Sequence, residues 1–241
     1  MPNISISRLS QFAGAMVLLL FPGGYIKQSQ AIHYLNTNVL QMPLNQMVTR
    51  PSGITTNTSD GELNEPSEFD AQRELVRFDK FVETVRDGNA DVVRGVYVPG
   101  HLASRVIQQP SGSSTYVSNR RGSVTQFRPA AKYGVTGLVA HNYLGGYNFY
   151  ELKPGMVVHL VYGDGKIKEY QVKEIHRYRK LSPHSTSSNL IDLSTGNKVT
   201  TLQVFNRFYR GGPRVTFQTC LEKDGNLYWG LLFVVAEPIL N

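Results

Sequence analysis

The chain has 241 residues, of which 41% are hydrophobic and 18% charged, and its formal net charge is +7. This length is sufficient for a normal hydrophobic core, which excludes the small folds that depend on several disulfides. Cys220 is the only cysteine, so an internal disulfide is excluded as well. Its thiol is therefore either a small buried apolar group or a reactive one.

Residues 1–31 have the layout of a secretory signal. Arg8 precedes an apolar stretch over residues 12–21, and the small residues Ser29 and Ala31 suit cleavage after Ala31. The apolar stretch is short for a membrane span, although an uncleaved N-terminal anchor is the alternative. Both readings predict a protein that is secreted or held at the cell surface, with possible membrane association through the N-terminus.

Residues 32–68 are rich in Asn, Thr, Ser, Pro and Gly and show no sustained hydrophobic period, which predicts a flexible linker. From Phe69 to Arg86, apolar residues recur at helical spacing with charges between them, and Asp87-Gly88-Asn89 ends the pattern. We therefore expect one folded domain over residues 69–241 that begins with a helix.

After this helix, short runs of Val, Ile, Tyr, Phe and Thr alternate with turn residues, which is typical of a mainly β, closed or nearly closed β-barrel with short helices. Gly163-Asp164-Gly165 and Lys223-Asp224-Gly225-Asn226 predict two hairpins. The expected strands are Val92–Val98, Arg105–Gln108, Ser114–Val117, Val124–Phe127, Gly137–His141, Met156–Tyr162, Ile167–Ile175, Leu190–Asp192, Thr200–Phe205, Arg214–Leu221 and Leu227–Pro238.

Two of these strands end in residues that suit nucleophilic catalysis. Thr216-Phe217-Gln218-Thr219-Cys220 ends in the lone thiol, and Val139-Ala140-His141-Asn142 ends in an imidazole. A histidine that takes or shares a thiol proton leaves a thiolate, which attacks carbonyl carbon. Cys220 and His141 are therefore the candidate catalytic pair.

In these two segments, and in Phe149–Val158 followed by Tyr170-Gln171-Val172, the chain resembles the sortase family of exported bacterial cysteine transpeptidases. The resemblance covers roughly residues 92–238. It implies a β-barrel and a reaction in which the thiolate attacks a backbone carbonyl of a C-terminal sorting-type peptide on an exported protein. A thioacyl-enzyme then passes its acyl group to an amine or to water.

The chain departs from the family at the third catalytic residue. Sortases carry an arginine on the strand after the cysteine, whereas here no Arg or Lys follows Lys223, and Leu231 best matches the arginine's position. A two-residue hairpin turn would set Cys220 opposite Trp229. Arg210 is the preferred substitute because Gly211-Gly212 follow it and allow a close backbone approach.

Other groups remain open for the same role. Asn142 or backbone N–H groups near Cys220 could polarise the substrate carbonyl. The alternative arginines are Arg177, Arg179 and Arg207, while Arg214 is too far from Cys220 along its strand. The residues expected to line a substrate groove are Thr219, Trp229, Asn142 and Leu231.

Two functions from different classes follow from these residues. The first is a sortase-like cysteine transpeptidase or peptidase, with His141 protonating the leaving amine. The second is a catalytically impaired module of the same fold that binds peptides or joins a surface assembly. We expect no cofactor, no metal site and no nucleic-acid partner, because neither metal-ligand spacing nor a nucleic-acid motif is present.

Overall fold

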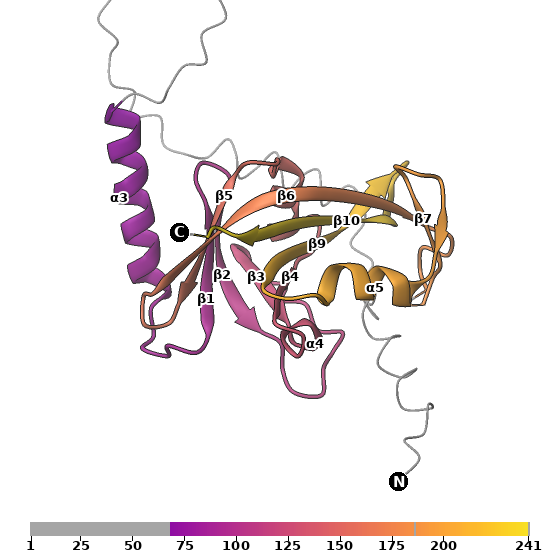
Figure 1. Ribbon diagram of the computed structural model, residues 1–241, viewed down its shortest axis with the longest axis horizontal. Coiled ribbons are helices and arrows are strands. Elements are labelled where there is room, and N and C mark those ends of the chain that lie inside the picture. Colours follow the sequence, from indigo (N-terminus) through magenta and orange to yellow (C-terminus); the bar gives the residue numbers. More distant parts are fainter. Residues whose placement is uncertain (1–67, 186, 241) are drawn as a thin grey trace, which may run out of the picture. The chain divides into compact units, whose positions relative to one another are not determined.

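The computed structural model describes residues 68–185 and 187–240 (Figure 1). The signal or anchor predicted over residues 1–31 lies outside this part of the chain, as does the linker predicted over residues 32–68 except for Glu68, which begins a helix. The expected N-terminal helix is present as α3 (Glu68–Val85), within one residue of its predicted bounds. From Glu74 onward the described residues belong to one compact unit. None of the helices in the described part combines the length and the apolar character needed to span a membrane.

The protein is mainly β, and its strands form one continuous sheet. The strands are β1 (Val93–Val98), β2 (Leu102–Gln108), β3 (Ser123–Phe127), β4 (Val135–Val139), β5 (Val157–Tyr162), β6 (Ile167–Lys180), β7 (Leu190–Asp192), β8 (Lys198–Val199), β9 (Arg214–Lys223) and β10 (Asn226–Pro238). Three short helical segments accompany them: α4 (Arg128–Ala131), the 3₁₀ helix η1 (Gly145–Glu151) and α5 (Thr201–Tyr209).

The sheet closes into a barrel. Its strand order is β10-β9-β4-β3-β2-β1-β5-β6-β7-β8, and β10 also pairs with β6. That last pairing joins β10, β9, β4, β3, β2, β1, β5 and β6 into a ring, while β7 and β8 extend the sheet beyond it. Closure pairs each strand of the ring on both sides, as expected for a fold of many short strands, while β8 remains an edge strand.

Side chains on the two faces of the sheet form two separate cores. The inner cluster fills the barrel and includes Val96, Leu138, Phe217 and Leu232. An outer cluster lies on the opposite face and joins side chains of α5 to those of β4, β6, β9 and β10. Figure 1 shows α5 alongside these strands. We call these the inner cluster and the outer cluster. Because side chains alternate along a strand, β9 contributes Phe217 to the first and Cys220 to the second.

Two of the expected strands are wrong. Thr200–Phe205 belongs to α5, because Thr200 and Gln203 form a capping box and the apolar residues after them lie on one helical face. Ser114–Val117 forms no strand. Instead, the side-chain amide of Gln109 donates hydrogen bonds to the carbonyls of Ser114 and Tyr116, so these two backbone groups are paired without a neighbouring strand.

The turn between β9 and β10 is as predicted, but the register beyond it is not. Asp224 and Gly225 both adopt positive φ, and Asn226 pairs with Lys223. The register then shifts between Asn226 and Gly230, so that Cys220 pairs with Leu231 rather than with Trp229. A bulge on β10 thus moves the predicted pairing by two residues.

Candidate active site

His141 follows the end of β4, and Cys220 lies near the end of β9. These strands pair in parallel with Val139 opposite Gln218, and Ala140 N–H still donates to the Gln218 carbonyl at 3.2 Å. His141 and Cys220 each lie two residues beyond this last pair, so a continuation of the same register would set them opposite one another. Both lie on the side of the outer cluster, where Cys220 packs and where His141 bonds the backbone of Val117.

Both side chains are buried, and burial sets their protonation. Cys220 is 7% exposed and His141 is 4% exposed. Burial lowers the pKa of His141 to about 4, although its backbone hydrogen bond to Val117 opposes the shift. Burial also raises the pKa of the Cys220 thiol to about 11, against the opposing charge of Lys180. The Cys220 thiol and the His141 imidazole are therefore both neutral at neutral pH.

Leu231 lies directly across from Cys220 on β10 and is fully buried. On the other side of Leu231, Tyr178 of β6 continues the same row of side chains. The sequence assigned the position of the sortase arginine to Leu231, and the structure sets this leucine beside the thiol. A leucine side chain donates no hydrogen bond, so this neighbour cannot stabilise an oxyanion.

A group of hydrogen bonds fixes the backbone around the pair. Thr219 Oγ1 donates to the Ala140 carbonyl at 2.9 Å, which ties β9 to the residue before His141. Tyr150 of η1 donates to the Cys220 carbonyl and also bonds the side chain of Asn142. The Asn142 amide donates to the Leu227 carbonyl at 3.1 Å. Thr219 and Asn142 therefore support the site rather than pointing freely into solvent.

The loop after His141 needs a glycine where it meets β9. Gly146 N–H donates to the His141 carbonyl at 2.9 Å. A Cβ at this position would lie 2.6 Å from the His141 carbonyl oxygen and 2.3 Å from Thr219 Oγ1. Because both distances are far below van der Waals contact, only glycine allows η1 to begin so close to His141 and Thr219.

The structure does not bring Arg210 to Cys220. Its guanidinium lies 4.4 Å from the ring centroid of Tyr133 and donates to the Tyr133 hydroxyl at 3.1 Å. Tyr133 precedes β4 by two residues, and Val135 at the start of β4 pairs with Arg214. Cys220 lies six residues beyond Arg214, roughly 20 Å along an extended strand.

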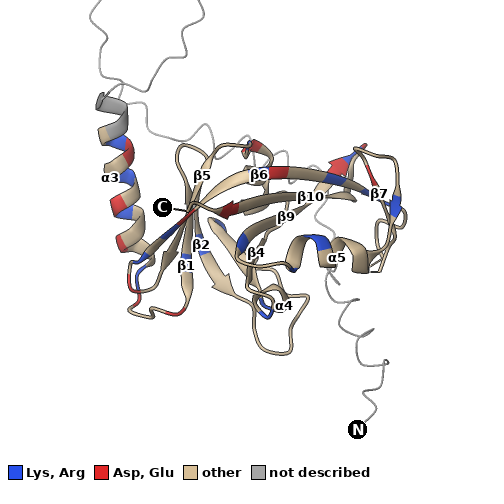
Figure 2. Ribbon diagram, viewed as in Figure 1, with Lys and Arg blue, Asp and Glu red and all other residues tan. Residues whose placement is uncertain are grey.

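Arg207 is occupied as well. It donates to the Tyr178 hydroxyl at 3.3 Å and approaches the Asp192 carboxylate at 3.6 Å. Figure 2 shows basic residues on α5 and near the start of β9, away from the end of β9 that carries Cys220. Arg177 and Arg179 are exposed on β6. The charge of Arg177 acts on Tyr150, whose hydroxyl donates to the Cys220 carbonyl, whereas Arg207 and Arg210 are directed to other groups.

Trp229 also lies elsewhere than expected. It packs against the inner cluster, with the Lys223 ammonium 5.2 Å from its ring centroid, while Tyr228 packs against the outer cluster. The bulge in β10 explains the exchange, because it reverses which of the two aromatic residues faces Cys220.

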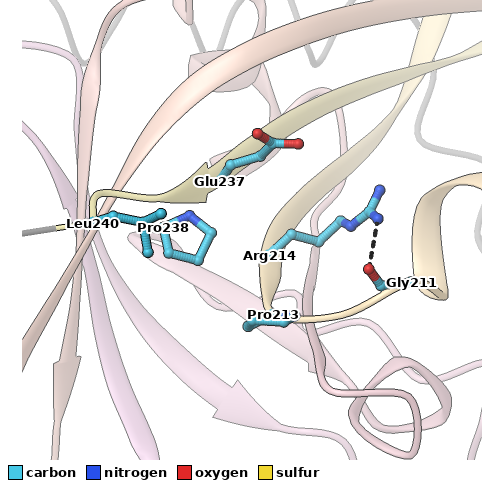
Figure 3. A pocket seen from close by; sticks show the side chains of 6 residues that line it. All are labelled: Gly211, Pro213, Arg214, Glu237, Pro238 and Leu240. Atoms are coloured by element: carbon cyan, nitrogen blue, oxygen red, sulfur yellow. Dashed lines mark hydrogen bonds between the residues drawn. The ribbon is translucent and has the colours of Figure 1, made fainter.

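A hollow near the start of β9 is separate from this site. Gly211, Pro213, Arg214, Glu237, Pro238 and Leu240 line it. Figure 3 shows the Arg214 guanidinium turned toward the Gly211 carbonyl, to which it donates at 3.2 Å. Arg214 is thus held at the opposite end of β9 from Cys220 and takes no part in the thiol's surroundings.

Four neighbours of Cys220 were not identified from the sequence. The thiol interacts electrostatically with Tyr143, Tyr150, Tyr228 and Lys180. Tyr143 also stacks on His141, with ring centroids 5.1 Å apart. The only feature of the sequence that could have pointed to Tyr143 was its position two residues after His141. Lys180 lies 40 residues before Cys220, so only the pairing of β6 with β10 could have revealed it.

The arrangement suits acyl transfer by a thiol. A buried imidazole beside a thiol can accept its proton as the sulfur attacks, and can return a proton to a leaving amine. No group of three His, Cys, Asp or Glu side chains that could hold a metal ion occurs among residues 68–185 and 187–240. The thiol and the imidazole near the ends of β4 and β9 are thus the groups in the described part of the chain to which such chemistry would fall.

Comparison with known proteins gives similarity in structure but not in sequence. No family model matches the chain, and no curated protein matches it. The structure is similar to that of sortase C1 from Streptococcus suis, at 14% identity and a TM-score of 0.42, over 76% of this chain and 90% of that one.

Two further sortases show the same level of similarity. Sortase C-1 from Actinomyces oris is 17% identical with a TM-score of 0.40, over 71% of this chain and 86% of that one. Sortase A from Listeria monocytogenes is 16% identical with a TM-score of 0.37, over 62% of this chain and 88% of that one. A similarity at this level does not assign an activity.

Proposed function

We propose that the protein is a cysteine acyltransferase or peptidase of the sortase type, with Cys220 as nucleophile and His141 as proton carrier. One observation supports this proposal: β4 pairs in parallel with β9 up to Val139 and Gln218, and the imidazole and the lone thiol each follow two residues later, on the side of the outer cluster. Adjacency of nucleophile and base is the geometric requirement for a thiol nucleophile.

The reaction proceeds in two steps. Cys220 sulfur attacks a backbone carbonyl carbon, a C–S bond forms, and the thiol proton passes to His141. The C–N bond then breaks, and the imidazolium gives that proton to the leaving amine, which leaves a thioester on Cys220. An incoming amine or water attacks the thioester carbon, the C–S bond breaks, and the proton of the attacking group returns to sulfur through His141.

Protonation in the resting site shapes this mechanism. Since the pKa of Cys220 is raised to about 11 and that of His141 is lowered to about 4, no thiolate–imidazolium pair forms before substrate binds. Proton transfer accompanies the attack on the carbonyl, and His141 acts first as base and then as acid. The role predicted from sequence, protonation of the leaving amine, is the second of these two events.

The substrate class follows from the sequence resemblance. We propose that the donor is an exported protein with a C-terminal sorting-type peptide, that the acceptor is an amine or water, and that the protein works at the cell surface. Tyr143 is partly exposed and stacks on His141, so a peptide that reaches the thiol passes this ring.

A second function is favoured by one specific observation. Leu231, without a hydrogen-bond donor, lies across from Cys220 on β10, and the thiol is buried. These features suit a peptide-binding module of the same fold that does not form a thioester. The two functions differ in whether Cys220 becomes acylated.

The deciding experiment is covalent labelling of the full-length protein by a panel of peptidyl chloromethyl ketones at pH 7 to 9. Intact mass and peptide mapping should show one adduct on Cys220, with at least a hundredfold slower labelling in His141→Ala. Cys220→Ala is the blank. Absence of an adduct on the folded protein, while the unfolded protein reacts fully with iodoacetamide, would exclude the enzyme and leave the binding module.

A further inference from the structure

Neither β4 nor β10, the strands that pair with β9, carries a Lys or Arg, but Lys180 lies nearby on β6. Lys180 is 4% exposed, and its ammonium donates to the Pro183 carbonyl in the loop between β6 and β7. A lysine this deeply buried is unusual, because removing its charge from water carries a large free-energy cost unless a partner compensates. The carbonyl of Pro183 meets only part of that requirement.

The sheet register turns Lys180 toward the face that carries Cys220. Cys220, Leu231 and Tyr178 form one row across β9, β10 and β6. Lys180 lies two residues beyond Tyr178, on the same face by strand alternation, and its partner on β7 is Leu190 of the outer cluster. The lysine therefore lies diagonally behind Leu231 as viewed from the thiol.

The two side chains interact electrostatically, and each shifts the other. The ammonium of Lys180 acts to lower the pKa of the thiol, and Cys220 acts to raise the pKa of Lys180, in both cases against the larger effect of burial. The other titratable groups that interact with Cys220 are tyrosines: Tyr143 after β4, Tyr150 of η1 and Tyr228 of β10. These tyrosines carry no positive charge, and His141 is neutral above about pH 4.

We propose that Lys180 is the cation that stabilises negative charge on Cys220 and on the substrate oxygen during acyl transfer, a role that Leu231 cannot fill. The proposal rests on the proposed function for its catalytic part. The neighbouring cation from α5 is Arg207, whose charge is directed to Asp192 and Tyr178. Among residues 68–185 and 187–240 no carboxylate forms an ion pair with Lys180, whose ammonium is directed to the neutral Pro183 carbonyl.

Its test measures the thiolate directly, without a substrate. At pH 9 the rate of alkylation of Cys220 by iodoacetamide follows the fraction of thiolate, which changes tenfold for each pKa unit. Lys180→Met should lower this rate about tenfold or more, because a nearby opposite charge typically shifts a carboxylate or thiol by 1 to 3 units. Lys180→Arg should restore most of it.

A matched control separates charge at this position from charge in general. Lys173→Met makes the same side-chain change at an exposed position of the same strand and should leave the alkylation rate unchanged. Equal rates in the wild type and Lys180→Met would overturn the proposal, as would equal slowing by Lys173→Met. Thermal unfolding confirms that each variant is folded at the temperature of the assay.

A reciprocal measurement decides the matter if Lys180→Met does not fold. Because coupled groups shift one another, the titration midpoint of the Lys180 ammonium, followed by NMR of its ε-carbon, should be lower in Cys220→Ser than in the wild type. An unchanged midpoint would overturn the proposal. If the coupling is present but no peptide acylates Cys220, the lysine's effect on the thiol stands and the proposed enzyme function fails.

Discussion

The two ends of β9 differ in how they hold positive charge. At its start, Arg207, Arg210 and Arg214 lie close together, but each guanidinium is directed to a carbonyl, a carboxylate or an aromatic ring near the protein surface. At its end, one ammonium, that of Lys180, is buried and interacts with the thiol. Water screens the first group far more than the second.

This difference shows that the density of charge in the sequence is a poor guide to where charge matters chemically. The arginine-rich segment attracts attention in the sequence, yet the structure turns its side chains away from Cys220. A single lysine that is distant in sequence has the larger electrostatic effect on the thiol, because the surrounding side chains exclude water. The predictions below test this contrast between the two ends.

The largest expected effect is that of His141→Ala. Loss of the proton carrier should slow thioester formation on Cys220 by about 10²- to 10⁴-fold with any peptide that acylates the wild type. The measurement is the single-turnover rate of acylation by intact mass. His159→Ala, which removes a histidine on β5, is the control and should retain the wild-type rate. Equal rates in the wild type, His141→Ala and His159→Ala would show that His141 is not the proton carrier for Cys220.

The second prediction concerns acid stability. The pKa of His141 is lowered to about 4 in the folded protein, below the unfolded value of 6.5, so the unfolded state binds more protons between these pH values. The stability that neutral His141 contributes is present above pH 6.5 and is lost as pH falls toward 4. The loss amounts to about 3 kcal/mol.

Denaturant unfolding at pH 7, 5.5 and 4.5 measures this loss. His141→Gln should flatten the part of the pH dependence that is due to this residue. The pKa of His159 is also lowered by burial, but the Glu169 carboxylate opposes the shift, so His159→Gln should change the dependence less. The interpretation fails if His141→Gln shows the same acid loss as the wild type.

Much of the fold was accessible from the sequence, because alternation and turn residues are local signals. The long strand β10 and the Asp224-Gly225 turn follow directly from them. The segment Thr200–Phe205 was predicted as a strand because Val204 and Phe205 favour strands. It forms a helix because Thr200 and Gln203 make a capping box at its start. Local propensity therefore gave way to a cap and to packing on the sheet.

The candidate site, too, could be only partly predicted from the sequence. Cys220 and His141 were singled out because each follows a recognisable apolar run, and only the parallel pairing of β4 with β9 shows that these two runs are neighbours in the sheet. The bulge in β10 could not be predicted, since nothing in Leu227-Tyr228-Trp229 marks two extra residues. For a related reason the sequence did not identify Lys180 as a neighbour of Cys220: the position of Lys180 depends on the pairing of β6 with β10, which closes the barrel.

A third prediction compares two buried threonines of β9. Thr219 Oγ1 donates to the Ala140 carbonyl and Thr216 Oγ1 to the Phe208 carbonyl, at 2.9 and 2.7 Å. Replacement of either by Val leaves a buried carbonyl without this donor and should cost about 1 to 2 kcal/mol in the free energy of unfolding. Only Thr219→Val should also slow acylation of Cys220, because Ala140 precedes His141. Equal acylation rates would show that this bond has no positioning role.

The smallest expected effect is that of Arg210→Met, at the arginine-rich start of β9. Loss of the contacts with the Tyr133 and Phe205 rings should cost about 0.5 to 1 kcal/mol of stability, the range typical of exposed cation–π pairs. Alkylation of Cys220 at pH 9 should stay at the wild-type rate, in contrast to the fall expected for Lys180→Met. Since methionine removes the charge in both variants, the pair compares the two ends of β9 with one chemical change. An equal fall in both would mean that the surface arginines act on the thiol over the length of the strand, and burial would then not be what separates the two ends.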